Sequence, residues 1–299
     1  MADIKKNEDF YLKIKATTND VFYTFLTTHS LLKYVITCDS CLVPMESFNT
    51  KRSPEGKEFK CKNKHCLKYT TTKSIREGSF FSCFRTPIKT ILEIIWLYSK
   101  DESLKNIRKE VDCSTLTVMK IIKSLNYKMK EFFEKNKILL GGPNSICQID
   151  ETLLSGKRKY NVGNQVSKQT WVFGICDPST IPALGFMKVV PDRRAETLIP
   201  IIKEIVRPGT IIWSDEWPAY RNLWKSYVHE TVNHKINFVN PQTGAHTQNI
   251  ESYWNKVKLK IKKRKGIVKG KIDEFITEHL FFERNEGKLF VELLNLIKV

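Results

Sequence analysis

The 299-residue sequence has no long apolar run. Its most apolar stretch, residues 88–98, is well short of the roughly 20 residues needed to cross a bilayer, and Lys89 and Glu93 interrupt it. The first 40 residues also lack the basic-then-apolar pattern of a secretory signal. We therefore expect neither a membrane span nor a signal peptide, and we expect residues 88–98 to form a buried helix.

Acidic residues are scarce relative to basic ones. The sequence has 32 Asp and Glu against 50 Lys and Arg, a formal charge of +18. Like charges repel in a compact protein, so an excess of this size favours a polyanionic partner. Nucleic acid is the first expectation and an anionic membrane surface the second. A lysine-rich proteome with well-solvated surfaces would give the same count.

The eight cysteines do not indicate a disulfide framework, because no secretory signal accompanies them. Four of them form two short pairs, Cys38-x2-Cys41 and Cys61-x4-Cys66, with 19 residues between the pairs. This spacing is typical of a tetrahedral zinc site with four thiolate ligands. Four thiolates leave no open position for chemistry, so we expect a structural Zn²⁺ that stabilises a polar stretch. His65 is an alternative ligand, although we expect it to face solvent.

Hydrophobic periodicity divides the chain into helical and strand-rich parts. Five β-type runs fall at 146–149, 170–175, 183–190, 210–213 and 227–232, with a helix at 195–206. We expect an N-terminal helical segment (1–37), a zinc-ribbon-like module (38–80), a helical region (86–140), an α/β core (144–285) and a C-terminal helix (286–299).

Residues 102–133 favour two helices joined by a tight turn at 112–114, with Ser114 as the N-cap of the second. Followed by a basic surface, this pattern suits a helix-turn-helix that enters the major groove. Any helical hairpin would show the same pattern. The expected contact joins one face of each helix: Leu104, Ile107 and Val111 against Leu116, Met119 and Ile122.

Three carboxylates carry the strongest chemical signal. Asp150 and Asp215 each end an apolar run, where a buried carboxylate is costly unless it is paired or meets a metal. Glu251 lies near the start of a later helix, which can present it to the other two if it packs across the sheet. Oxygen ligands suit Mg²⁺, and two such ions promote phosphodiester displacement. Turn formation or helix capping by each aspartate alone is the alternative.

Two neighbouring acids compete with this set. Glu151 and Glu216 adjoin the two aspartates, but strand alternation predicts that they point to the opposite face. We therefore exclude them from the expected ligands.

The element order β-β-β-α-β-α-β-α is that of a ribonuclease-H-like nucleotidyltransferase core. Within it, residues 150–152, 213–220, 232–234 and 244–258 resemble the DDE transposases of the Merlin superfamily and their bacterial insertion-sequence relatives with an ISXO-like domain. The cysteine module and the following residues 76–81 are similar to that family's zinc ribbon and the segment after it. The resemblance covers about residues 35–285.

This resemblance implies a metal-binding DDE triad of Asp150, Asp215 and Glu251 that holds two Mg²⁺ or Mn²⁺ ions. It also implies that Lys258 contacts DNA near the active site. The implied activity is cleavage of phosphodiester bonds at transposon terminal repeats and joining of the freed 3′ ends to target DNA. The implied partners are double-stranded DNA and further copies of the same chain.

A run of basic residues continues the helix of Glu251: residues 247–271 contain nine Lys or Arg and one acid. Such a run neutralises phosphates without reading sequence, although a solvated charge run is the alternative. The run also resembles a nuclear-localisation patch, so we expect the nucleus in a eukaryote and the cytoplasm otherwise. The candidate DNA contacts are Lys258, Lys262, Lys263, Arg264 and Lys265.

Two other functions fit part of the pattern. A domesticated, non-catalytic DNA-binding protein derived from a transposase would keep the zinc module and the basic helix. A structure-specific nuclease or ribonuclease H would hydrolyse without joining. The intact triad speaks against the first, and a strand-transfer assay distinguishes the second.

Overall fold

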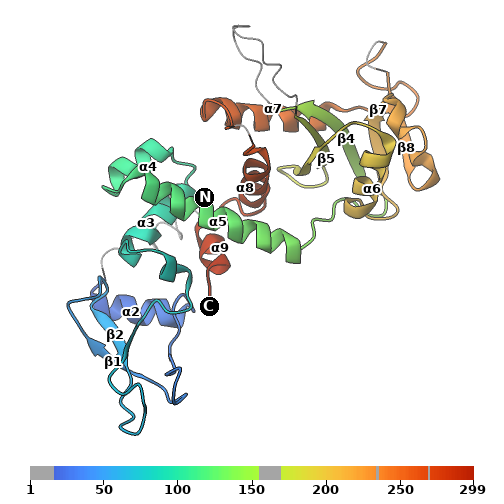
Figure 1. Cartoon of the computed structure of the whole chain (residues 1–299). Helices are drawn as coiled ribbons and strands as arrows, with labels where there is room; N and C mark the ends of the chain where they lie inside the picture. Colours follow the sequence, from blue (N-terminus) through green and yellow to red (C-terminus); the bar gives the residue numbers. More distant parts are fainter. Residues whose placement is uncertain (1–16, 155–169, 234–235, 269) are drawn as a thin grey trace. The chain divides into compact units, whose positions relative to one another are not determined.

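A computed structural model describes residues 17–154, 170–233, 236–268 and 270–299 (Figure 1). The chain divides into two compact units, one formed by Met1–Met129 with Asn285–Val299 and the other by Lys130–Arg284. Among the described residues, no helix has both the length and the apolar character that a membrane span requires.

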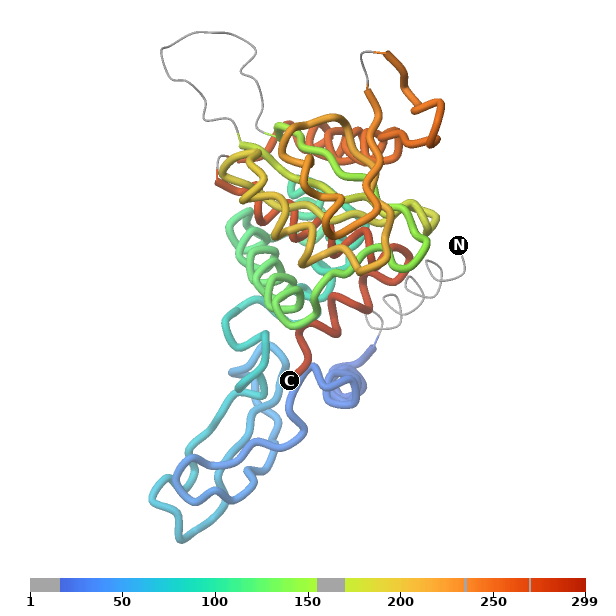
Figure 2. Tube along the Cα trace, turned by 90° about the vertical axis from the view of Figure 1, so that its right-hand side faces the viewer, coloured from blue at the N-terminus to red at the C-terminus, as the bar shows by residue number. Residues whose placement is uncertain are grey.

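The first unit contains a small three-stranded sheet and a group of helices. Its strands form an antiparallel meander, in which the chain runs back and forth (Figure 2). The C-terminal helix, α9 (Leu289–Leu296), packs against α3 (Ile88–Ser99), where the ring centroids of Trp96 and Phe290 lie 5.1 Å apart. The elements are α2 (Asn19–Thr28), β1 (Glu46–Asn49), β2 (Lys57–Lys60), β3 (Thr72–Ser74), η1 (Phe80–Cys83), α3 (Ile88–Ser99), α4 (Leu104–Glu110), α5 (Thr115–Lys135) and α9 (Leu289–Leu296). The last turn and a half of α5, residues 130–135, belongs to the second unit.

The N-terminal helical segment is shorter than the spacing predicts. Helix α2 ends at Thr28 because Ser30 adopts a positive φ of 58°, which terminates the helix, and the Leu31 amide bonds back to the Leu26 carbonyl. Leu31 and Leu32 are buried outside the helix, while Val35 is exposed. Residues 1–16 of the expected segment lie outside the described residues.

The two expected helices of residues 102–133 are present as α4 and α5. Ser114 caps α5 as predicted, since its Oγ accepts a hydrogen bond from the Thr117 amide at 3.1 Å. The predicted contact face of α5 is wrong. Leu116 and Met119 are 79% and 49% exposed. Leu116 lies two residues, about 200° of helix rotation, before Val118 of the buried face, and Met119 lies about 100° beyond Val118. That face consists of Val118, Ile121, Leu125 and Met129.

The second unit is built on a five-stranded sheet in which all five expected runs form strands. The strand order is β6-β5-β4-β7-β8; β4, β5 and β6 pair antiparallel, whereas β4, β7 and β8 pair parallel. This is the strand order of a ribonuclease-H-like core, which confirms the predicted fold class. The strands are β4 (Ile146–Leu153), β5 (Trp171–Asp177), β6 (Leu184–Val190), β7 (Ile211–Asp215) and β8 (Val228–Val232).

One expected helix is absent. The segment between β7 and β8 forms two short 3₁₀ turns, η2 (Pro218–Tyr220) and η3 (Leu223–Lys225). Pro218 fixes the start of the first turn. The helices of this unit are α6 (Ala195–Ile205), α7 (Gln248–Lys263) and α8 (Ile272–Arg284).

An apolar cluster covers each face of the sheet of which β4 is the central strand. Ile149 belongs to a cluster with α6, which includes Phe173 and Ile202. The opposite face of the sheet packs against α7 and α8 through a second cluster that contains Val172 and Trp254. Because strand side chains alternate, Asp150 lies on the face that α7 covers. Figure 1 shows α7 alongside β4 and β5.

Candidate active site and metal centre

Asp150 lies within β4 and not at its end, because the strand continues to Leu153. Burial raises the pKa of its carboxyl group to about 7, with smaller contributions from the nearby charges of Glu151 and Asp215. A carboxylate is therefore costly at this position unless a cation compensates its charge.

The structure brings Asp215 close to Asp150. Strands β4 and β7 run parallel with Gln148 opposite Trp213, so two residues further along each strand the two aspartates are neighbours. The Asp215 Oδ1 atom accepts a hydrogen bond from the Trp217 amide at 3.0 Å, which orients the carboxylate at the end of β7.

Glu251 lies in the first turn of α7, where it is exposed and accepts a hydrogen bond from Thr247 Oγ1 at 2.9 Å. One turn further, Trp254 Nε1 donates to Asp150 Oδ2 at 3.1 Å. Residues three apart share a helix face, so Glu251 lies one turn from the residue that contacts Asp150. The three carboxylates do not form a closed cluster. Among the described residues, the four cysteines form a closed cluster, in which all ligand atoms lie within 4.8 Å of one another.

The helix that carries Glu251 is tied to β4 by a second contact that the sequence did not predict. Gln148 Oε1 accepts hydrogen bonds from the amides of Asn249 and Ile250, at 2.9 and 3.0 Å. Gln148 Nε2 lies 3.3 Å from Nδ1 of His246, and the His246 ring packs against Trp213. His246 and Asn249 both lie in residues 244–258, a segment that carries the family resemblance, and the sequence alone does not separate their roles.

Gly174 makes the approach of Trp254 possible. It lies opposite Asp150 on β5, and a Cβ atom at this position would be 2.4 Å from Trp254 Cζ2. A larger residue would therefore displace the indole from the sheet. An isolated glycine in a strand signals such a close approach, but the sequence does not identify its partner.

Glu151 points to the opposite face of the sheet, as strand alternation predicts. Glu151 accepts hydrogen bonds from Arg193 Nε and Nη2 at 3.0 and 2.8 Å, and from the Tyr220 hydroxyl on the α6 side of the sheet. The Arg193 guanidinium lies over the rings of Trp171 and Trp217, at 4.5 and 3.9 Å. Glu216 is exposed. Glu151 therefore stabilises the fold beneath the site.

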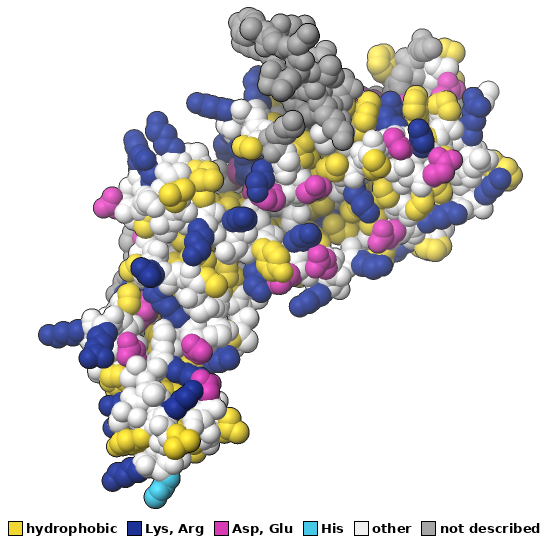
Figure 3. Space-filling model, viewed as in Figure 1, with side chains coloured by type: hydrophobic (Ala, Val, Ile, Leu, Met, Phe, Trp, Pro, Cys, Tyr) yellow, Lys and Arg dark blue, Asp and Glu magenta, His cyan; other side chains and the backbone are white. Residues whose placement is uncertain are grey.

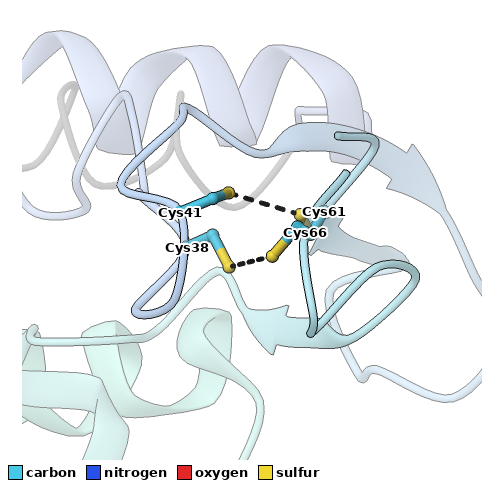
Figure 4. Close-up of side chains that lie close together, drawn as sticks. All are labelled: Cys38, Cys41, Cys61 and Cys66. Atoms are coloured by element: carbon cyan, nitrogen blue, oxygen red, sulfur yellow. Dashed lines mark hydrogen bonds between the residues drawn. The ribbon is translucent and has the colours of Figure 1, made fainter. Parts of the chain in front are cut away.

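The four predicted cysteines converge in the first unit (Figure 4). The sulfur atoms of Cys38 and Cys66 lie 3.7 Å apart, and those of Cys41 and Cys61 lie 3.9 Å apart. A tetrahedral site with Zn–S bonds of about 2.3 Å has sulfur atoms about 3.8 Å apart, so the arrangement fits zinc. Backbone amides of Cys41 and Ser40 lower the pKa of Cys38 to about 6, which favours the thiolate. His65 is exposed, as expected.

Comparisons with known proteins agree with these features. The model of the ISXO2-like transposase domain matches residues 139–281. An uncharacterized transposase-like protein of Haemophilus influenzae is 32% identical over 108 residues, which cover 36% of this chain and 86% of that protein. The chain belongs to the ISXO2-like transposase family. The resemblance to DDE transposases with an ISXO-like domain is thereby confirmed.

Solved structures resemble this transposase only distantly. The catalytic core domain of BIV integrase is 14% identical, with a TM-score of 0.29, over 44% of this chain and 78% of that chain. The Mos1 transposase paired-end complex with the left transposon end is 10% identical, with a TM-score of 0.29, over 68% of this chain and 73% of that chain. The fold assignment rests on the strand order.

The candidate DNA-contacting residues of this transposase differ in their contacts within the protein. Lys258 is exposed and lies two turns after Glu251 on the same face of α7. Lys262, Lys263 and Lys265 are also exposed. Arg264 instead forms an ion pair with Glu278, a buried residue of α8. In the face that Figure 3 shows, lysine and arginine side chains are spread over the surface.

Proposed function

We propose that this transposase cleaves phosphodiester bonds at transposon terminal repeats and joins the freed 3′ ends to target DNA. Asp150, Asp215 and Glu251 would hold two Mg²⁺ or Mn²⁺ ions for this reaction. The observation that carries the proposal is the pairing of Asp150 and Asp215 on neighbouring strands beneath the helix of Glu251.

The donor set fits these ions. Carboxylate oxygens are the ligands that Mg²⁺ prefers, and a few of them leave room for phosphate oxygens. The raised pKa of Asp150, caused by burial, reflects an anion that a bound cation would stabilise. When bound, the two ions would supply an activated attacking oxygen and stabilise the leaving one.

The rest of the chain would bind double-stranded DNA ends and orient them at the site. The working assembly would be a homo-oligomer. Lys258, Lys262, Lys263 and Lys265 are exposed and would neutralise phosphates beside the site. In the first unit, the four thiolates would hold a structural Zn²⁺. The exposed N-terminal half of α5, with Leu116 and Met119, suits apolar contact with thymine methyl groups in the major groove.

A cleavage and strand-transfer assay tests the proposal. Purified protein would receive DNA that carries the flanking repeat ends of its own gene, with Mg²⁺ or Mn²⁺. We expect nicking at the repeat ends and joined products, and a loss of at least about 1,000-fold in Glu251→Gln, because a neutral amide cannot replace the anionic oxygen ligand that the two ions would need. Glu216→Gln removes an exposed acid beside Asp215 and should retain activity.

The other outcomes identify the competing functions. Binding of repeat ends without cleavage in either metal would indicate a domesticated DNA-binding protein. Metal-dependent cleavage without joined products would indicate a nuclease. Equal losses of activity in the Glu251 and Glu216 variants would show that the assigned triad is wrong.

A further inference from the structure

Gln148 is a fully buried polar residue, 0% exposed, on the strand that carries Asp150. Both are on the α7 face of β4, two residues and therefore about 7 Å apart. A buried amide must satisfy its polar atoms, and this one does so on the first turn of α7. The contact spans 101 residues of sequence to the Asn249 amide.

The first turn of a helix has amides without partners inside the helix, and the N-cap side chain usually accepts from them. Helix α7 departs from this pattern. Its N-cap residue Thr247 makes no side-chain capping bond, and Thr247 Oγ1 instead donates to Glu251. Gln148 supplies the missing acceptor from the sheet, so the cap of α7 is also its attachment to β4.

The network fixes the orientation of the Gln148 amide. Because Oε1 accepts from two backbone amides, Nε2 is the atom that faces His246 Nδ1. The same Nδ1 also accepts from the Gln248 amide at 3.3 Å. Gln148 therefore connects β4, the start of α7 and His246, two residues before the helix.

We propose that Gln148 is a positioning residue that sets the rotation and height of α7, and thereby holds Glu251 within reach of a cation bound by Asp150 and Asp215. This inference rests on the proposed function. Glu251 follows Ile250 directly, so a shift of the capped turn moves the Glu251 carboxylate with it. Trp254 provides the second point of attachment, one turn later.

The test compares Gln148→Met with Thr210→Val in the full-length protein. Both variants remove buried side-chain bonds to distant backbone while preserving side-chain size. Thr210 Oγ1 accepts from the Gly142 amide at 2.9 Å and precedes β7, five residues and about 17 Å from Asp215. Mn²⁺ binding would be measured by electron paramagnetic resonance, and exchange of the Asn249 and Ile250 amides by NMR.

We expect Gln148→Met to weaken Mn²⁺ binding roughly 10-fold, as loss of a supporting contact to a metal site usually does, and to accelerate exchange of both amides. Thr210→Val should lower thermal stability without changing Mn²⁺ affinity. Unchanged Mn²⁺ affinity in Gln148→Met, or equal weakening in Thr210→Val, would overturn the inference.

A second variant keeps the test informative if Gln148→Met does not fold. Gln148→Glu retains an acceptor for both amides but replaces the Nε2 donor that faces His246 with a second acceptor. It should therefore keep the Asn249 and Ile250 amides protected and bind Mn²⁺ within a few-fold of the wild type. A loss of about 10-fold in Mn²⁺ affinity with both amides still protected would also overturn the inference. Asp150→Asn distinguishes failure of the proposed function from failure of this inference. If this variant leaves Mn²⁺ affinity unchanged, the proposed triad is wrong, whatever the result for Gln148.

Discussion

The two units of this transposase present their candidate metal ligands in opposite ways. In the first unit the four cysteine sulfurs already lie within 4.8 Å of one another, on loops beside three strands of three or four residues. In the second unit the carboxylates are distributed over two strands and a helix, and the sheet that carries the two aspartates lies between two apolar clusters. A metal would thus stabilise the fold of the first unit, whereas in the second unit an already stable fold would position the metal ligands.

The largest expected effect follows from removing a sulfur ligand. Cys61→Ser should unfold residues 38–75, because a structural zinc site contributes on the order of 10 kcal/mol to the folding of such a module. Limited proteolysis and amide exchange of the full-length protein would locate the loss. A strong chelator should have the same effect on the wild type.

The second unit is the control for this experiment. Asp150→Asn should leave both units folded, because the apolar clusters around β4 do not depend on a cation. Protection of residues 38–75 that survives complete zinc removal would contradict the contrast between the units.

A pH-dependent difference should follow from the raised pKa of Asp150. Its carboxyl group has an ordinary pKa of 3.8 when unfolded and about 7 when folded, so the folded protein binds the proton more tightly. The free energy of unfolding of the metal-free wild type should therefore fall between about pH 4 and pH 7, relative to Asp150→Asn, by at most about 4 kcal/mol.

Urea denaturation of both proteins at several pH values would measure this difference, since groups common to both cancel. A constant difference from pH 4 to pH 8 would show that Asp150 is not strained by burial. Mg²⁺ above pH 7 should restore stability to the wild type and have a smaller effect on the variant.

The sequence predicted the parts of this site that follow from local pattern. Strand periodicity places Asp150 and Asp215 on two strands of the core, and two short cysteine pairs predict a cluster. The parallel pairing that makes the two aspartates neighbours comes from the structure. Gln148 and Gly174 were not predicted, because each contacts a helix that is distant in the sequence. Local residue spacing does not indicate which distant segment a residue contacts. The exposed face of α5 was missed for a related reason: its apolar residues lie on two faces, and only packing selects the buried one.

A matched pair of glycine variants sharpens the assignment of Trp254. Gly174→Ala and Gly185→Ala each place a Cβ against α7, at 2.4 Å from Trp254 Cζ2 and 2.1 Å from Tyr253 Cζ. Both should cost about 1–3 kcal/mol of stability through overpacking. Only Gly174→Ala should weaken Mn²⁺ binding, because Trp254 contacts Asp150 whereas Tyr253 contacts Glu283. Thermal denaturation and Mn²⁺ titration give the two readouts, and equal losses of Mn²⁺ affinity would contradict a specific role for Trp254.

The smallest expected effect distinguishes two basic residues of the same run. Lys262 is exposed, so Lys262→Ala should weaken DNA binding a few-fold and reduce the salt slope by about 1, with no change in stability. Arg264→Ala should instead lower stability, because it removes the ion-pair partner of buried Glu278 and leaves Lys260 at 3.8 Å as its remaining cationic partner in the described part of the unit. Fluorescence anisotropy with a repeat-end duplex at several salt concentrations, together with thermal denaturation, would separate these roles. A larger salt-slope change in Arg264→Ala than in Lys262→Ala would mean that DNA competes successfully with Glu278 for the guanidinium, and that this helix contact rearranges when DNA binds.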